Sequence, residues 1–134
     1  MSRSLPAALL VALALAGCGA QQEDAGVDRF DGEQRRVAQV VEDLRDAASK
    51  QDAAEICSRV LARPLVDRIG AGPLTCEGEI EKALEDADGF ELTVQRVAVA
   101  GPAAATAQVH DGQGRTRTLG FLREGRDWRL ASLG

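Results

Sequence analysis

Few side chains in this chain could do chemistry. The 134 residues include three cysteines (Cys18, Cys57 and Cys76), one histidine, one tryptophan and no tyrosine. A zinc site needs several cysteine or histidine ligands, and two cysteines with no nearby histidine do not complete it. The absence of tyrosine excludes reactions that rely on a tyrosine acid. We therefore expect no metal site and no cofactor, which leaves thiols, one imidazole, carboxylates and guanidinium groups.

Other polar motifs each have a chemical and a structural interpretation, and we favour the structural one. His110 stands beside the turn Asp111-Gly112, where it could act as a general base or simply be a surface turn residue. Trp128 could stack on a ligand, but on a last strand it is more typical of a core. An acidic cluster lacks the spacing of a calcium loop and suits the solvated face of a helix. Its members are Glu77, Glu79, Glu81, Glu85, Asp86 and Asp88.

Two arginines on one predicted strand are candidates for holding an anion. Arg115 and Arg117 have the same parity as Leu119 and Phe121, so the four side chains share one face of the strand. If that face lines a pocket, the guanidinium groups can hold a carboxylate at its mouth. The alternative is that the arginines keep an exposed strand soluble and discourage edge pairing. These four residues form the candidate ligand site.

Helices are expected to come first in the folded region. Apolar residues recur there with helical spacing, and two capping boxes, Asp31 with Gln34 and Asp52 with Glu55, mark helix starts. Pro64 cannot continue a helix but can begin a short new turn. The expected helices cover residues 33–49, 53–61 and 76–87, with the short turn between the last two.

Strands are expected beyond Gly89, where the apolar period changes to two. The alternation switches phase at Gln95-Arg96, which predicts a β-bulge. Short loops join the strands, and sequential hairpins imply an antiparallel meander. The predicted class is α+β, with two to three helices packed on a curved four-stranded sheet. The expected strands cover residues 90–99, 103–109, 115–123 and 128–133.

Residues 1–17 have the features of an export signal. The apolar run 5–16 follows a positive start and is too short to span a membrane, which takes about 20 residues. The run ends in Leu15-Ala16-Gly17-Cys18, and this segment resembles the signal peptide of bacterial lipoproteins. The resemblance implies that the Cys18 thiol receives a diacylglycerol and that cleavage occurs just before it. The alternatives are cleavage by the ordinary signal peptidase or an uncut anchor.

The lipoprotein resemblance implies an anchored chain on the extracytoplasmic face of the cell membrane. Residues 18–31 are polar and acidic, which predicts a lipidated flexible tether before one folded domain over 32–134. Gly19 resembles the pattern that permits transfer to the outer membrane in diderm bacteria. Arginine greatly outnumbers lysine, which is typical of GC-rich genomes such as those of actinobacteria. The net charge of −5 argues against nucleic acid as a partner.

The order of elements over 33–134 resembles the nuclear transport factor 2-like superfamily, a curved α+β cone also called cystatin-like. The resemblance lies in the opening amphipathic helix, the step Lys50-Gln51-Asp52 between helices and the closing stretch 122–130. It implies a pocket between the sheet and the helices in many members. Some members are isomerases or dehydratases that use Asp, Tyr or His, and others only bind, inhibit or dimerise.

Cys57 and Cys76 are predicted to form a disulfide. Both lie on the apolar faces of neighbouring predicted helices, and an exported domain retains disulfides. A bridge closing a loop of about 20 residues would stabilise the fold by about 3 kcal/mol. Two buried free thiols are the alternative.

Three functions remain open at this point. The leading hypothesis is a non-enzymatic lipoprotein domain that binds a small apolar or anionic ligand or an envelope protein. The second is an enzyme of the isomerase or dehydratase type, which the missing tyrosine disfavours. The third is a pocketless structural module that forms a homodimer through an open sheet face.

Overall fold

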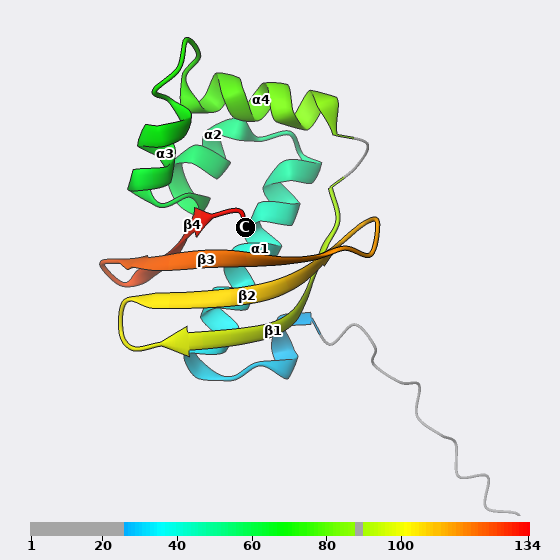
Figure 1. Ribbon diagram of the computed structural model, residues 1–134, viewed down its shortest axis with the longest axis vertical. Coiled ribbons are helices and arrows are strands. Elements are labelled where there is room, and N and C mark those ends of the chain that lie inside the picture. Colours follow the sequence, from blue (N-terminus) through cyan, green and yellow to red (C-terminus); the bar gives the residue numbers. More distant parts are fainter. Residues whose placement is uncertain (1–25, 88–89) are drawn as a thin grey trace, which may run out of the picture.

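The chain forms a group of helices followed by an antiparallel sheet, as the computed structural model describes for residues 26–87 and 90–134 (Figure 1). The predicted α+β class is therefore confirmed. The helical elements are η1 (Gly26–Arg29), α1 (Gly32–Ser49), α2 (Ala53–Glu55), the π-helix η2 (Ile56–Val60), α3 (Arg63–Ile69) and α4 (Cys76–Asp86). The strands are β1 (Leu92–Ala100), β2 (Ala104–Asp111), β3 (Thr116–Glu124) and β4 (Asp127–Ser132).

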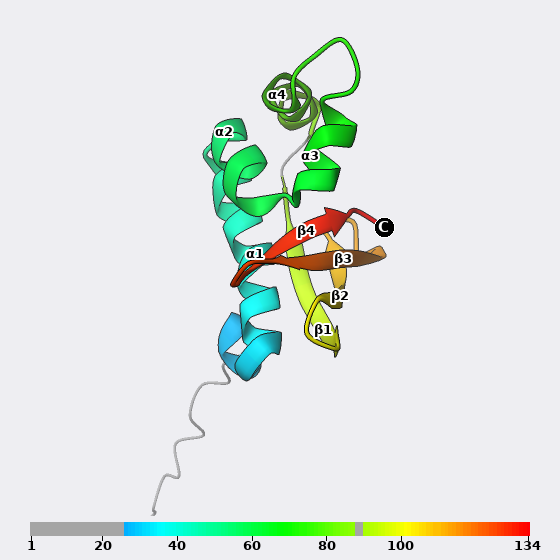
Figure 2. The same cartoon turned by 90° about the vertical axis from the view of Figure 1, so that its left-hand side faces the viewer.

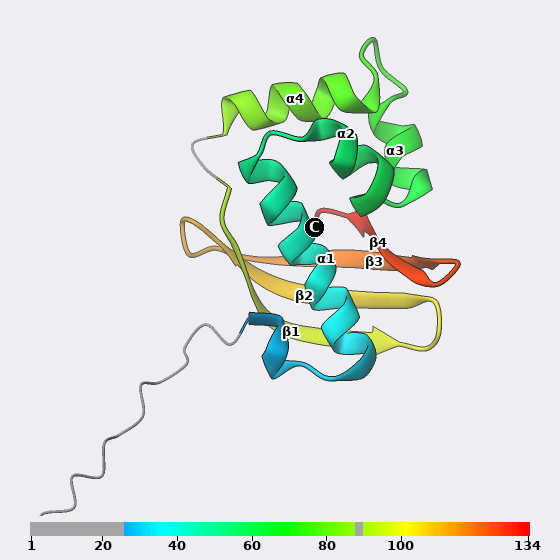
Figure 3. The ribbon, with the colours of Figure 1, turned by 180° about the vertical axis from the view of Figure 1, so that it is seen from behind.

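The four strands are ordered β1-β2-β3-β4, each antiparallel to its neighbour. The register between β1 and β2 shifts between Val94 and Arg96, which confirms the bulge predicted from the switch in apolar phase. A second shift, between Gly120 and Phe121 of β3, has no counterpart in the predictions. The meander places the β2–β3 hairpin at one end of the sheet and the β3–β4 hairpin at the other (Figures 1 and 3).

Helix α1 crosses one face of the sheet and forms the core with it (Figure 2). Its apolar residues Val37, Val41 and Leu44 are at most 6% exposed and belong to one cluster with Val109 and Leu130 of the strands. Each such side chain contributes about 1.5–3 kcal/mol when it leaves water. The apolar residues at helical spacing thus form the buried face of α1, as predicted.

The ends of the helices follow the predicted caps only in part. Asp52 caps α2, because its Oδ1 accepts a hydrogen bond from the Glu55 backbone N–H at 3.0 Å. The predicted box at Asp31 is wrong, since its side chain makes no capping hydrogen bond. Gln34 instead donates from its amide to the Val97 carbonyl of β1, at 3.4 Å, and so ties α1 to the sheet.

The segment after α2 differs most from expectation. A continuous helix over 53–61 is predicted, but after one turn the chain winds into the π-helix η2 and ends at Leu61. Leu61 then pairs with Leu130 of β4 as an isolated parallel bridge, and the Ala62 N–H donates to the Leu130 carbonyl at 2.7 Å. Because the chain must leave the helix to meet the edge of the sheet, tertiary pairing overrides the local helical pattern here.

The opposite face of the sheet is uncovered by helices (Figure 2). It carries mainly polar side chains, among which Thr93, Arg96, Thr106 and Thr118 are exposed. Leu122, 37% exposed, is the one large exposed apolar side chain that the described strands contribute. This face therefore lacks the extended apolar surface that a dimer of packed sheets would need.

Candidate functional site

A cleft of about 700 Å³ lies at the β2–β3 hairpin end of the sheet, and we call it the hairpin cleft. The hairpin, the last residues of α4 and the start of β1 surround it. Its apolar lining consists of Leu44, Ala87, Phe90, Leu92, Leu119 and Leu133, and its polar lining of Asp86, Glu91, Asp111, Gly112, Gln113, Arg115 and Arg117. This volume is within the usual range for small-molecule sites, roughly 300–1,000 Å³.

Asp111 organises the charged side of the hairpin cleft. One carboxylate oxygen, Oδ1, accepts hydrogen bonds from the backbone N–H groups of Gln113 and Arg115, both at 2.9 Å. The other, Oδ2, accepts from the Nε atoms of Arg115 at 2.9 Å and Arg117 at 3.4 Å. The backbone bond from Arg115, followed by that from Gln113 and the Arg115 guanidinium, lowers the pKa of Asp111 to about 2.

This arrangement has a chemical consequence for both partners. A carboxyl group with a pKa near 2 is a weak proton acceptor at neutral pH, so Asp111 is poorly matched to general-base catalysis. The two arginines use their Nε–H groups on Asp111, and their terminal Nη atoms make no hydrogen bond to other residues in the described ranges. The aspartate thus holds the guanidinium groups in place and leaves their outer donors for a ligand.

A second cleft, of about 610 Å³, lies at the opposite end of the sheet, and we call it the arginine cleft. It is bounded by the outer side of α1, by η2 and by the β3–β4 hairpin. Four arginines line it, Arg36, Arg59, Arg126 and Arg129, with only two carboxylates, Asp43 and Asp127. Cationic side chains therefore outnumber carboxylates here, whereas the hairpin cleft has two arginines and three carboxylates.

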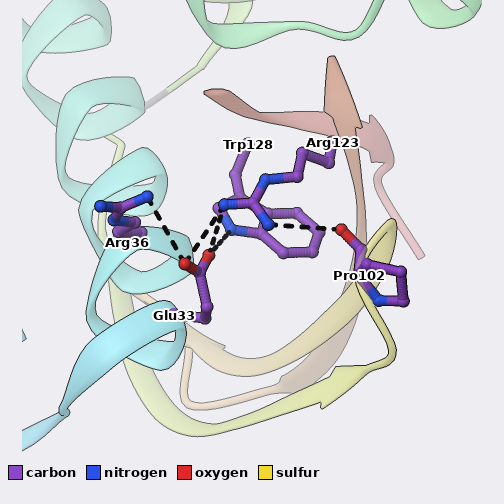
Figure 4. A network of polar contacts seen from close by, with 5 residues as sticks. All are labelled: Glu33, Arg36, Pro102, Arg123 and Trp128. Carbon is purple, nitrogen blue, oxygen red and sulfur yellow. Dashed lines mark hydrogen bonds and ion pairs between the residues drawn. The ribbon is translucent and has the colours of Figure 1, made fainter. Parts of the chain in front are cut away.

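A polar network lies beside the arginine cleft, shares Arg36 and Trp128 with its lining, and joins α1 to the last hairpin (Figure 4). Glu33 accepts a hydrogen bond from Trp128 Nε1 at 2.6 Å and from Arg123 Nη2 at 3.1 Å, and lies 3.4 Å from Arg36. The Arg123 guanidinium also lies over the Trp128 ring, 5.3 Å from its centroid. The bond from Trp128, assisted by the charges of Arg123 and Arg36, holds the pKa of Glu33 below its usual value.

The other three arginines of the cleft, Arg59, Arg126 and Arg129, lie outside this network. Arg59 on η2 and Arg126 in the hairpin are exposed, and neither forms an ion pair with a described carboxylate. Arg129 donates to the Ser58 carbonyl at 3.0 Å and lies 3.9 Å from Asp127. The cleft therefore contains two held arginines and two whose charges are not matched within the described fold.

The predicted disulfide is present in the structure between Cys57 of η2 and Cys76, the first residue of α4. Their Cα atoms are 6.2 Å apart, within the ordinary range for a bridge. The bridge ties the π-helix that carries Arg59 to α4. The helical connection between the two cysteines is thereby closed into a loop.

The structure brings together three of the four predicted ligand residues. Arg115, Arg117 and Leu119 all line the hairpin cleft, whereas Phe121 is 3% exposed and packed in the core. His110 is half-buried at the end of β2, and Trp128 is buried, as expected of a core residue. Cys18 and Asp88 lie outside the described residues.

Sequence reasoning missed the arginine cleft. Its four arginines come from α1, η2 and the β3–β4 hairpin, so no local spacing connects them. The excess of basic residues near the end of the chain is the only signal that could have suggested it.

The described residues contain neither a metal-binding cluster nor a membrane-spanning helix. In the described ranges, no group of three His, Cys, Asp or Glu side chains is placed to hold a metal ion. Among the helices that the structure describes, none is long and apolar enough to cross a membrane. Comparison of the chain with protein-family models, curated proteins and solved structures gave no match.

Proposed function

We propose that this protein is a lipid-anchored, extracytoplasmic binding domain, and that its hairpin cleft holds a small amphipathic carboxylate. The observation that carries the proposal is the pair Arg115 and Arg117, fixed by Asp111 beside an apolar lining. An apolar chain would lie against Leu119, Phe90 and their neighbours, and its carboxylate would meet the outer nitrogens of the arginines.

The distribution of charge around the cleft constrains the orientation of such a ligand. Asp86 lies at the end of α4, whereas Glu91, just before β1, lies against the hairpin, with a carboxylate oxygen 3.4 Å from where a Cβ on Gly112 would stand. These carboxylates repel an anion, whereas the negative charge of Asp111 is offset by the two arginines that it holds. The carboxylate of the ligand is therefore expected on the arginine side only.

Thermal unfolding in the presence of medium-chain fatty acids tests the ligand. A ligand at about 100 times its Kd stabilises the folded state by about 2.7 kcal/mol, and hence raises the melting temperature. The corresponding fatty alcohols are the control, because they keep the chain and lack the charge. An Arg115→Gln, Arg117→Gln variant should lose the difference between acid and alcohol. Equal shifts with both ligands in the wild type would refute an anion site.

The anchor rests on Cys18 and is tested separately. A Cys18→Ser variant is expected to leave the membrane fraction, since it cannot receive the diacylglycerol. A Cys57→Ser, Cys76→Ser variant is the control, because it removes the other two cysteines and keeps the lipid acceptor Cys18. Retention of the Cys18→Ser variant in the membrane would show that the lipoprotein assignment is wrong.

A further inference from the structure

The arginine cleft holds cations that the fold itself does not neutralise. Arg59 and Arg126 are exposed and have no carboxylate partner among the described residues, and they share a cleft with Arg36 and Arg129. Unpaired arginines in one concave surface repel each other, and their forked donors match the oxygens of a phosphate group. On a chain with a net charge of −5, this local excess of cations marks the cleft as a candidate site for an external anion.

The distribution of charge over the molecule predicts which face turns toward an anionic surface. Acidic α4, with Glu77, Glu79 and Glu81 among its residues, lies at the end of the molecule remote from η1, where the described chain begins (Figures 1 and 3). The arginine cleft extends from Arg36, one turn into α1, to Arg59 on η2, which the Cys57–Cys76 bridge ties to the first residue of α4. An anionic surface would therefore attract the cleft, and the carboxylates of α4 would keep that helix turned away from it.

We propose that the arginine cleft binds the phosphate groups of anionic phospholipids and so seats the domain on the membrane that anchors it. The proposal rests on the anchor of the proposed function but concerns a different cleft from the ligand site. Arg59 and Arg126 contact the headgroup phosphates. Arg129 is held by Asp127 and Arg36 by Glu33, and both add to the positive potential of the cleft. The hairpin cleft, at the other end of the sheet, then remains open to a ligand.

The single tryptophan provides a reporter at this cleft. Trp128 lines the arginine cleft and is not part of the lining of the hairpin cleft. The full chain, purified from membranes, is reconstituted into phosphatidylcholine vesicles with or without phosphatidylglycerol. Both contain a lipid with a nitroxide on its headgroup, which quenches tryptophan emission at short range. Seating predicts stronger quenching of Trp128 when phosphatidylglycerol is present, and weaker quenching at high salt.

An Arg59→Gln, Arg126→Gln variant is the decisive comparison. Each arginine near an anionic surface favours the seated state by about fivefold. The ratio of seated to unseated chains on vesicles with phosphatidylglycerol should therefore fall roughly 25-fold in the double variant. Lys82→Gln with Arg96→Gln removes the same charge from α4 and from the open sheet face and should retain the ratio. Circular dichroism verifies that both variants are folded.

Each outcome decides the proposal. Equal quenching in both kinds of vesicle, or equal loss in both double variants, overturns the seated cleft. A change in Trp128 emission with inorganic phosphate in pure phosphatidylcholine vesicles would show a site for free phosphate and overturn the lipid as its source. A chain that sediments with neither kind of vesicle overturns the anchor and the seating together, whereas a chain that sediments without preferential quenching overturns only the seating.

Discussion

The two ends of the sheet differ in how their exposed arginines are paired with carboxylates. At the β2–β3 end, Arg115 and Arg117 both reach the carboxylate of Asp111 within the same hairpin. At the β3–β4 end, Arg59 and Arg126 come from different elements, and no described carboxylate pairs with either. A loop can position cations for a ligand by supplying their counter-charge. A surface assembled from distant segments can instead leave cations for an external anion.

The largest effect is expected from removing the disulfide, and it should differ between the two ends. Replacing Cys57 and Cys76 by serine should lower the free energy of unfolding by about 3 kcal/mol, because the loop in the unfolded chain is no longer closed. Urea denaturation measures the loss. Hydrogen exchange should accelerate in η2, which carries Arg59, more than in the β2–β3 hairpin. Equal acceleration at both ends would show that the bridge does not specifically hold the arginine cleft.

Acid should weaken the hairpin end through Asp111. Its pKa is lowered to about 2 in the folded state, from an ordinary value of 3.8, so its ionised form stabilises the fold. That contribution is present above pH 3.8 and is lost as the pH falls toward 2. Asp111→Ala removes both the carboxylate and the acceptor, so it should abolish this part of the acid dependence and speed amide exchange at Gln113 and Arg115 even at neutral pH. An unchanged exchange rate would mean that the turn alone fixes the hairpin.

Trp128→Phe tests the polar network beside the arginine cleft. An aromatic ring is kept, although it is smaller than the indole, but the Nε1–H bond to Glu33 at 2.6 Å is lost, so the pKa of Glu33 should rise toward its ordinary value of 4.5. Carbon-detected NMR titration of the Glu33 carboxyl group measures this change, and the titration of Asp111 at the other end serves as the control. If the Glu33 titration does not move, the arginines rather than Trp128 hold the carboxylate.

The smallest effect is expected from Arg126→Gln. This side chain is exposed and has no described ion-pair partner, so the free energy of unfolding should change by less than about 0.5 kcal/mol. Chemical denaturation is again the measurement, with Arg96→Gln on the open sheet face as a matched control. A clear destabilisation would show that Arg126 serves the fold, and the contrast between the two ends would then fail.

The predictable part of this molecule is the part with local causes. The bulge near Gln95 follows from a change of phase that any strand must accommodate, and the cap at Asp52 follows from a four-residue motif. The π-helix η2 could not be predicted, because it results from pairing between Leu61 and Leu130, far apart in the sequence. The hydrogen bond between Glu33 and Trp128 could not be predicted either, because it joins residues near opposite ends of the domain's sequence.

The candidate site shows the same division. The shared parity of Arg115, Arg117 and Leu119 placed them correctly on one face, but parity also assigned Phe121 to the cleft. Distance along the strand decides the difference, since Phe121 lies farther from the hairpin and within the core cluster. How deeply a side chain is buried depends on the elements that pack against its strand, and these elements are distant in the sequence.

The bridge between Leu61 and Leu130 has a consequence for how copies of this protein can associate. It closes the β4 side of the sheet, where Ala62 donates to Leu130 and Arg68 donates to the Ala131 carbonyl at 2.9 Å. The β1 side is the other edge, and there Arg29 donates to the carbonyls of Val94 and Gln95. A sheet with one closed edge can add one partner strand and then has no second edge to extend from. Pairing through β1 would stop at two chains, so edge pairing cannot extend this sheet into a continuous fibre.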